Sequence, residues 1–211
     1  AVVWQDARIT APGLYFRRFS TDGRPLTDEV RFAAFGARPV VAAGTDDRFR
    51  IVWLVGGTPT FALLDAAGSV VRGPVGLEGS SQAPRLALGP ANEANIVYEH
   101  RQLTLNYVVF RRFDADGNGP LCRTLLDNRD IIGSCRKTPD IATDAAGTST
   151  VLWIDLFGFN GWQVTRSQVH RDGCRLSSSQ TILCHIGNPC AGPVAQALCP
   201  VEPFTAYAFW Q

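Results

Sequence analysis

Residues 107–117, with the sequence YVVFRRFDADG, join a strand-forming segment to a tight turn. Aromatic and β-branched residues favour strands, and the Asp-Gly pair favours a hairpin turn. Residues 14–23, LYFRRFSTDG, show the same pattern near the start of the chain. We therefore predict a tandem repeat in which each unit contains this strand and this turn.

Two further strands precede this element in the repeating unit. The first is short, rich in small residues and led by a proline, at Pro39, Pro84, Pro139 and Pro193. A proline fits the first position of a strand, where its missing N–H does least harm. The second is apolar and ends near an aromatic residue that we expect to fill the space between units: Trp4, Trp53, Tyr98, Trp153 and Trp210.

With an outer strand after the turn, each unit has four strands and about 45 to 57 residues, which is the range of propeller blades. No segment shows sustained helical periodicity with caps. We predict an all-β fold, a single β-propeller over residues 1–211 built from four-stranded antiparallel blades. About five blade-like repeats are expected, at residues 1–38, 39–83, 84–138, 139–192 and 193–211, with the first and the last incomplete.

The composition is that of a folded globular chain, with 45% hydrophobic and 18% charged residues. The formal net charge of +1 excludes strong non-specific attraction to nucleic acid or to an anionic membrane and leaves open only attraction by a local patch. No apolar run reaches the roughly 18 residues that a transmembrane helix needs. The chain starts at Ala1 and contains no methionine, so we expect a processed or truncated product.

Both ends of the chain carry the second-strand motif, as Trp4-Gln5 and Trp210-Gln211. A ring closed by its own ends would need complementary strands and not two copies of one strand. Three explanations stay open: an excerpt of a longer propeller, an open array closed by a partner, and a cut ring of about five blades with one redundant strand.

All cysteines lie in the second half of the chain, at Cys122, Cys135, Cys174, Cys184, Cys190 and Cys199. An even number without the short C-x-x-C spacing of zinc sites favours disulfides in an oxidising compartment. Pairing of sequence neighbours is our hypothesis, namely 122 with 135, 174 with 184, and 190 with 199, although about 15 connectivities exist. We expect an extracellular, periplasmic or cell-surface protein.

These features resemble the tandem β-propeller repeats of secreted bacterial proteins. That pattern is a proline-led strand of small residues, a glycine turn, Val-Val-Trp, and an aromatic-Arg-Arg-Phe strand ending in Asp-x-x-Gly. Residues 2–4, 16–23, 39–68 and 110–117 carry it here, and the resemblance covers almost the whole chain. It implies an extracellular adhesion, scaffold or carbohydrate-binding module, and it identifies the fold better than the function because propellers host many unrelated activities.

Three acids follow the second-strand aromatic residue, namely Asp6, Glu99 and Asp155. Equivalent positions of a propeller lie at one rim, so we predict that these carboxylates lie near the mouth of the channel. They could bind a cation or hydrolyse a sugar, which requires two carboxylates at a defined separation. The alternative is that they accept hydrogen bonds from loop N–H groups.

Phe157, Phe159 and Trp162 lie in or beside the loop of residues 156–161. Exposed aromatic residues on a loop can stack on a sugar ring or contact a partner protein. The alternative is packing between blades. Together with the three acids they complete the predicted binding set.

The turn at residues 114–119, DADGNG, has the opening of a calcium loop, with Asp114, Asp116 and Asn118 as candidate ligands. The glutamate that closes such a loop is missing, because Leu125 stands at its position. The alternative is a polar hairpin turn. Calcium is the one cofactor that the sequence leaves open.

The arginine pairs Arg17-Arg18 and Arg111-Arg112 lie on predicted strands, where neighbouring side chains point to opposite faces. We expect one arginine of each pair to pack between blades beside a carboxylate and the other to be solvated.

No nucleophile-elbow, phosphate-loop, dinucleotide-binding or zinc-protease motif occurs in the sequence. We therefore expect a non-catalytic binding or structural module that docks to a partner protein in an extracellular assembly. A carbohydrate-binding, lectin-like propeller is the alternative, and a glycosidase is the third reading. The loops after the second strand differ between units, which favours a single protein contact over repeated glycan sites.

Overall fold

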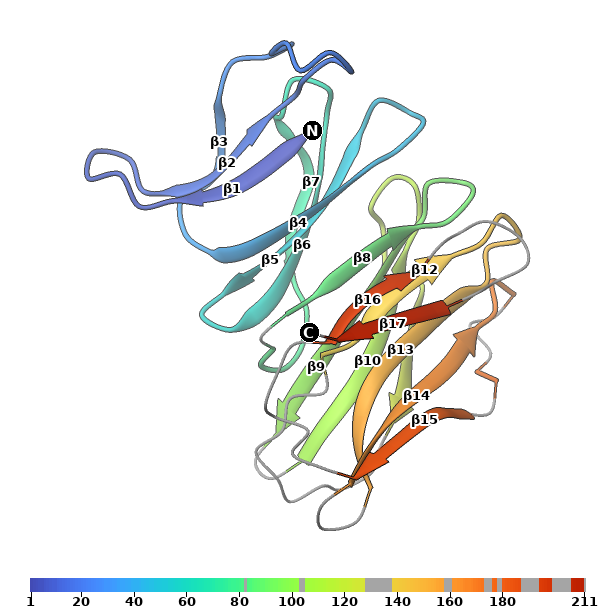
Figure 1. Ribbon diagram of the computed structural model, residues 1–211. Helices are drawn as coiled ribbons and strands as arrows, with labels where there is room; N and C mark the ends of the chain where they lie inside the picture. Colours follow the sequence, from blue (N-terminus) through green and yellow to red (C-terminus); the bar gives the residue numbers. More distant parts are fainter. Residues whose placement is uncertain are drawn as a thin grey trace.

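The computed structural model describes residues 1–81, 83–102, 105–127, 138–157, 161–172, 176–177, 180–186, 194–198 and 206–210. Within these residues the regular secondary structure consists of antiparallel strands, and no helix occurs. The predicted all-β class is therefore confirmed. The sheets follow one another along the chain, from β1–β3 at one end to β16–β17 at the other (Figure 1).

Each sheet is a meander in which hydrogen-bonded strands are also neighbours in the sequence. Sheet 1 contains β1 (Val2–Asp6), β2 (Gly13–Arg17) and β3 (Val30–Ala33). Sheet 2 contains β4 (Ala37–Ala43), β5 (Phe49–Val55), β6 (Thr58–Leu64) and β7 (Val70–Gly76). Sheet 3 contains β8 (Arg85–Leu88), β9 (Ala94–Gln102), β10 (Leu105–Phe113) and β11 (Cys122–Asp127). Sheet 4 contains β12 (Asp140–Thr143), β13 (Ser149–Phe157), β14 (Gly161–Val169) and β15 (Gln180–Ile186), and sheet 5 contains β16 (Val194–Leu198) and β17 (Ala206–Trp210).

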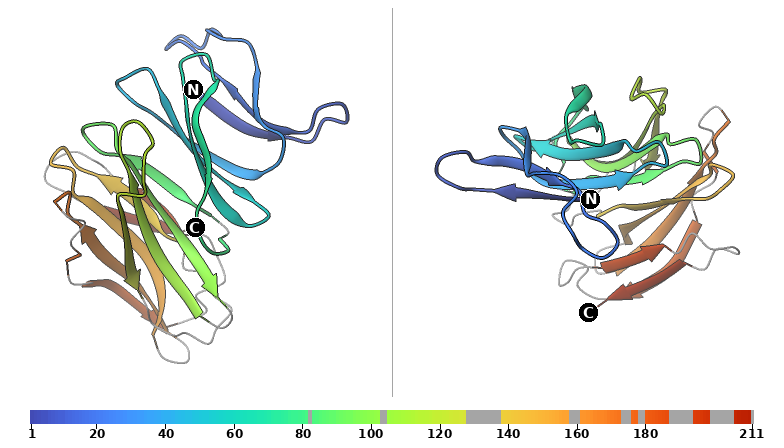
Figure 2. Two further views of the ribbon diagram at one scale, coloured as in Figure 1. Left: turned by 180° about the vertical axis from the view of Figure 1, so that it is seen from behind. Right: turned by 90° about the horizontal axis from the view of Figure 1, so that it is seen from above.

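The first strands of successive sheets lie beside one another. β1 contacts β4, β4 contacts β8, β8 contacts β12, and β12 contacts β16. These strands form the inner side of an arc around which the sheets are arranged, as the view from above shows (Figure 2). Pro84 and Pro139 lie immediately before β8 and β12, and Pro39 lies inside β4. Pro193 lies outside the described residues.

Among the described residues, six turns at one end of the sheets close in the same way, and we call this end the turn rim. In each, the amide of the first residue donates to the carbonyl of the fifth, as from Asp114 to Asn118 at 3.1 Å. The fourth residue has a positive φ, which favours glycine, as at Gly117 with 74°. Asp47 and Asn92 fill this position in two turns, at 55° and 63°. The turns are residues 20–24, 44–48, 65–69, 89–93, 114–118 and 144–148.

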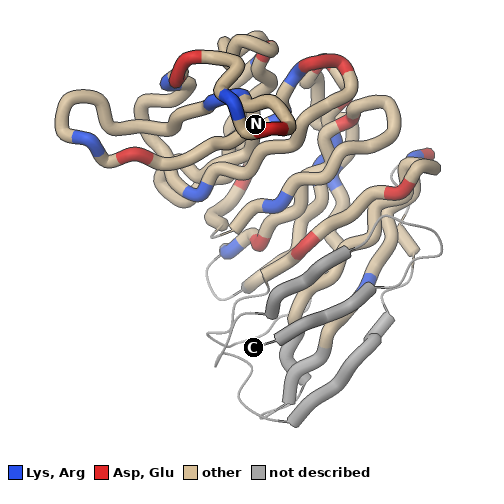
Figure 3. Tube along the Cα trace, turned by 45° about the horizontal axis from the view of Figure 1, so that its top comes forward, with Lys and Arg blue, Asp and Glu red and all other residues tan. Residues whose placement is uncertain are grey.

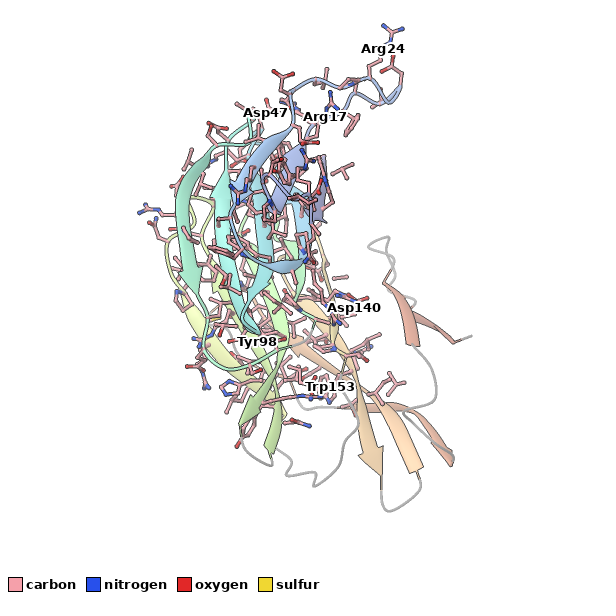
Figure 4. All side chains as sticks on the ribbon, turned by 90° about the vertical axis from the view of Figure 1, so that its left-hand side faces the viewer. Arg17, Arg24, Asp47, Tyr98, Asp140 and Trp153 are labelled. Atoms are coloured by element: carbon pink, nitrogen blue, oxygen red, sulfur yellow. The ribbon has the colours of Figure 1, made fainter. Side chains whose placement is uncertain are left out.

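Apolar clusters fill the spaces between successive sheets. Trp53 packs between sheets 1 and 2, Tyr98 between sheets 2 and 3, and Trp153 between sheets 3 and 4. Each is at most 2% exposed, and Figure 4 shows Tyr98 and Trp153 in the lower half of the molecule. The predicted aromatic packing between units is confirmed at these three positions. Trp4 is half-buried and stacks on Tyr15 with ring centroids 5.8 Å apart, and the side chain of Trp210 lies outside the described residues.

Both members of the second arginine pair are buried, at 8% exposure for Arg111 and 4% for Arg112. The side chain of Arg111 reaches the connector between sheets 2 and 3, where its Nη2 lies 2.9 Å from Glu78 Oε1. Arg112 donates from Nε to Asn95 Oδ1 at 2.7 Å and from Nη1 to the carbonyl of Arg171, just after β14 of sheet 4, at 2.9 Å. The expectation that one member is solvated is wrong here, because neighbouring sheets cover both faces of β10.

Candidate functional site

The end of the sheets opposite the turn rim carries the predicted acids, and we call it the connector rim. It includes the loop of residues 7–12, the connector 34–36, the turn 56–57 and the connector 77–84. Asp6 ends β1 and accepts hydrogen bonds from the amide and from Nε of Arg8, at 2.8 and 2.9 Å. These bonds lower the pKa of Asp6 below its usual value. Arg8 Nη1 also lies 2.6 Å from Glu29 Oε1.

Glu99 lies in β9 and is 2% exposed. Its Oε1 accepts a hydrogen bond from Arg101 Nε at 3.1 Å. Asp6 and Glu99 therefore share one arrangement, in which a carboxylate binds an arginine two residues further along the chain. This spacing of acid and arginine is visible in the sequence, and it is the signal from which the pairing could have been predicted.

The remaining members of the predicted binding set cannot be placed beside these two acids. β13 contains Asp155 and Phe157 and β14 contains Trp162, but their side chains lie outside the described residues. Phe159 lies outside them altogether. A cluster of Asp155 with Asp6 and Glu99 stays a prediction.

Three exposed apolar side chains lie on connector-rim segments of sheets 1 and 2. Ile9 is 100% exposed, Phe35 is 77% exposed and Val55 is 41% exposed. Leu54 pairs with Ala37 in the strand register, so Val55 lies beside the connector that carries Phe35. We call Ile9, Phe35 and Val55 the rim patch. No sequence pattern predicts it, because burial at a rim depends on how neighbouring sheets meet.

The backbone that carries the rim patch is held by specific contacts. Arg31 donates from Nη2 to the carbonyl of Pro12 and, at 3.4 Å, to that of Ala34, which ties the Ile9 loop to the Phe35 connector. Tyr15 donates to the carbonyl of Ala11 at 2.5 Å. The guanidinium of Arg8 lies 4.3 Å from the centre of the Tyr15 ring. The patch therefore sits on a fixed support.

The candidate calcium turn uses its carboxylates for other contacts. Asp114 Oδ1 accepts hydrogen bonds from the amides of Asp116 and Asn118, at 2.9 and 2.8 Å. Asp114 Oδ2 accepts one from Asn118 Nδ2 at 2.9 Å. Asp116 Oδ1 lies 2.8 Å from Arg48 Nη1 of sheet 2. Within the described ranges no group of three His, Cys, Asp or Glu side chains could hold a metal ion, and calcium at this turn stays untested.

Ion pairs and hydrogen bonds connect neighbouring sheets at the turn rim. Arg18 of sheet 1 lies 2.8 Å from Asp47 of sheet 2. The amide of Thr45 donates to Asn92 Oδ1 of sheet 3 at 2.9 Å. Acids predominate on these turns, and arginines in or beside the turns pair with Asp22, Asp46 and Asp47. Figure 3 shows acidic and basic segments near one another along the trace. This rim therefore serves mainly to join the sheets.

The predicted disulfides fall almost wholly outside the described part of the chain. Cys122 starts β11 and packs beside the cluster between sheets 3 and 4. The side chains of the other five cysteines are not among those described, so the pairing scheme stays a prediction. No helix able to span a membrane is present in the described ranges.

No protein-family model matches the sequence, and no curated protein matches it. Among solved structures, the chain is similar to a structure titled the Dos1 propeller, with a TM-score of 0.42 and 14% identity over 72% of this chain. The match spans 39% of that chain, well under two thirds of its length. A second similar structure is a putative 6-phosphogluconolactonase from Bacteroides uniformis, with a TM-score of 0.35 and 14% identity, over 91% of this chain and 69% of the other.

Proposed function

We propose that the chain is a non-catalytic binding or structural module that docks to a partner protein through the rim patch. The observation that carries this proposal is the exposure of Ile9 and Phe35 on a support fixed by Arg31 and Tyr15. Large apolar side chains exposed together at one rim are typical of protein interfaces. An aromatic residue on a pre-organised backbone loses little entropy on binding, which suits it to anchor a contact.

The acids of the same rim fit binding better than hydrolysis. A general acid for glycoside cleavage needs a raised pKa, so that it carries a proton near neutral pH. The pKa of Asp6 is lowered by its hydrogen bonds from Arg8. Glu99 is buried against Arg101. Both carboxylates are thus engaged by an arginine two residues further along the chain.

The arrangement of the sheets also supports a proposal about the fold that is more specific than the all-β class. Sheets 2, 3 and 4 are four-stranded meanders, the first strands of successive sheets lie side by side, and aromatic residues fill the spaces between the sheets. These are the elements of a β-propeller. We therefore propose that sheets 1 to 5 are blades of such a propeller. Export and stabilisation by disulfides belong to the same proposal and rest on the cysteine content.

A binding experiment with matched variants tests the docking proposal. The chain is immobilised as wild type, as the Ile9→Ser/Phe35→Ser double variant, and as Leu121→Ser, whose residue is 59% exposed outside the rim patch. A purified partner captured from the native source is expected to bind wild type and Leu121→Ser equally. The double variant should bind at least about tenfold more weakly, the usual cost of losing an interface anchor.

Two outcomes would contradict the proposal. Equal partner binding by the double variant would exclude the rim patch as the docking site. Binding of a defined sugar on a glycan array, with no protein partner recovered, would favour the lectin-like alternative instead.

A further inference from the structure

Two arginines, Arg111 and Arg123, contact the carboxylate of Glu78. These residues are distant in the sequence from those of the rim patch. Arg111 of β10 and Arg123 of β11 are direct partners in the strand register. Glu78, in the connector between sheets 2 and 3, places Oε1 2.9 Å from Arg111 Nη2. The same oxygen accepts a hydrogen bond from Arg123 Nε.

The two arginines differ in their access to solvent. The side chain of Arg111 is 9% exposed, and its Nε donates to Tyr98 Oη at 3.3 Å, so its position is fixed. The side chains of Arg123 and Glu78 are 39% and 43% exposed. One fixed cation therefore stands beside an accessible cation, and the carboxylate between them can be reached from solvent.

The positive charge and the N–H donors of Arg111 and Arg123 exceed what the Glu78 carboxylate engages, so the two arginines can bind another acceptor group. Two guanidinium groups carry a charge of +2 against −1 for Glu78, since arginine stays protonated at neutral pH. Arginine binds a carboxylate most strongly through two parallel N–H bonds. Among the described residues, the contacts to Glu78 engage Arg111 Nη2 and Arg123 Nε on a single shared oxygen. Glu78 thus uses only part of the available donors.

The imidazole of His100 adds a polar group beside this cluster. The backbone of Gly79 lies against its ring, because a Cβ built at Gly79 would be 2.5 Å from His100 Cγ. His100 Nδ1 is buried and has no hydrogen-bond partner among the described residues. Buried polar atoms are nearly always paired, so this nitrogen is an exception beside the connector that carries Glu78.

We propose that Arg111 and Arg123 form a binding site for a carboxylate-bearing ligand, which Glu78 occupies as an internal competitor. The carboxylate of Glu78 shows which group the two guanidiniums accept. A ligand that displaces it would gain the donors that Glu78 does not engage and would release the connector that carries Glu78. The site goes beyond the proposed docking function and does not depend on it.

Glutarate, whose carboxylate resembles a glutamate side chain, is the probe for this site. Its dissociation constant is measured by NMR titration at constant ionic strength for wild type, Glu78→Gln, Arg123→Gln and Arg24→Gln. Removal of an internal competitor that occupies the site about nine-tenths of the time should tighten binding about tenfold in Glu78→Gln. Arg123→Gln should abolish binding. Arg24, whose side chain is 84% exposed, is the matched control and should behave as wild type.

The proposal is overturned if Glu78→Gln binds glutarate no more tightly than wild type. It is equally overturned if Arg123→Gln binds glutarate as tightly as wild type does. If circular dichroism shows that Glu78→Gln is unfolded, the comparison of Arg123→Gln with wild type is by itself the test of the proposal. Equal affinity for sulfate would contradict the assignment to carboxylates.

Discussion

At the level of single residues, the acids of this chain mainly orient arginines. Asp46 Oδ1 lies 2.6 Å from Arg50 Nη1, and Asp46 Oδ2 lies 2.8 Å from Arg48 Nε. Arg50 is fully buried and donates from Nη2 to the carbonyl of Ala115 in sheet 3 at 2.6 Å. Asp46 therefore holds the guanidinium of Arg50 in place, and this group connects sheet 2 to the turn of sheet 3 that contains Ala115.

Replacement of Asp46 by asparagine should destabilise the protein in a pH-dependent way. The hydrogen bond from Arg50 is the main cause of a pKa well below the usual value for Asp46. Because the folded-state pKa is the lower one, the stabilisation is present above the unfolded-state value of about 4 and is lost as pH falls toward the folded-state value. We expect Asp46→Asn to lower the free energy of unfolding by about 1–3 kcal/mol at pH 7.

Urea unfolding at pH 7 and at pH 2.5 measures this effect, and the loss should be smaller at the lower pH. Asp28→Asn is the control, because Asp28 is exposed and should cost little at either pH. A loss for Asp46→Asn that is the same at both pH values would contradict the explanation.

At the level of strands and turns, the effect of a substitution at the fourth position of a turn in the turn rim depends on the atoms around that position. At Gly68, with φ of +90°, a Cβ would lie 2.6 Å from Cδ1 of the fully buried Phe16 in sheet 1. At Gly23, with φ of +83°, a Cβ would meet nothing within 4 Å. The same backbone conformation therefore has two different environments.

Replacement of each of these two glycines by alanine should separate the energetic cost of backbone strain from the cost of disturbed packing. Gly23→Ala is expected to cost about 1–2 kcal/mol for the left-handed conformation alone. Gly68→Ala should cost a further 1–3 kcal/mol or so, because Phe16 must move within a packed cluster. Chemical denaturation of both variants measures the difference, and equal costs would show that Phe16 adapts freely.

At the level of the complete fold, stability depends on the contacts between sheets. Phe61 of sheet 2 stacks on Phe113 of sheet 3 with ring centroids 4.4 Å apart. Trp153 of sheet 4 is 1% exposed and packs against side chains of sheet 3. Its indole N–H is buried without a hydrogen-bond partner among the described residues, so the residue acts through its volume.

Truncation of Trp153 should therefore weaken the whole assembly. Trp153→Ala is expected to cost about 3–5 kcal/mol, because it leaves a cavity between two sheets. Trp153→Phe should cost clearly less, since most of the ring volume remains and no hydrogen bond is lost. Trp4→Ala is the control at the half-buried equivalent position and should cost less than Trp153→Ala. Thermal or urea unfolding gives the ranking, and a larger loss for Trp4→Ala would contradict it.

The sequence predicts local structure here better than it predicts surfaces. Strand propensity and Asp-Gly turns identify the all-β class and the four-stranded antiparallel units, because both signals act within one unit. The burial of Arg111 and Arg112 and the exposure of Phe35 depend on how neighbouring sheets cover a strand. The hydrophobic periodicity within one unit contains no information on how the neighbouring sheets cover it. The side chains of Asp155 and Trp162 lie outside the described residues, so that part of the prediction stays untested.

Asp47 and Asn92 have a consequence for engineering repeats of this kind. Each fills a turn position that glycine fills elsewhere, and each uses its side chain to bind a neighbouring sheet, through Arg18 and Thr45 respectively. A unit transplanted to another place in the array would bring this side chain without its matching group. The units are therefore not interchangeable modules, and shuffled arrays would need these two residues exchanged together with their acceptors and donors.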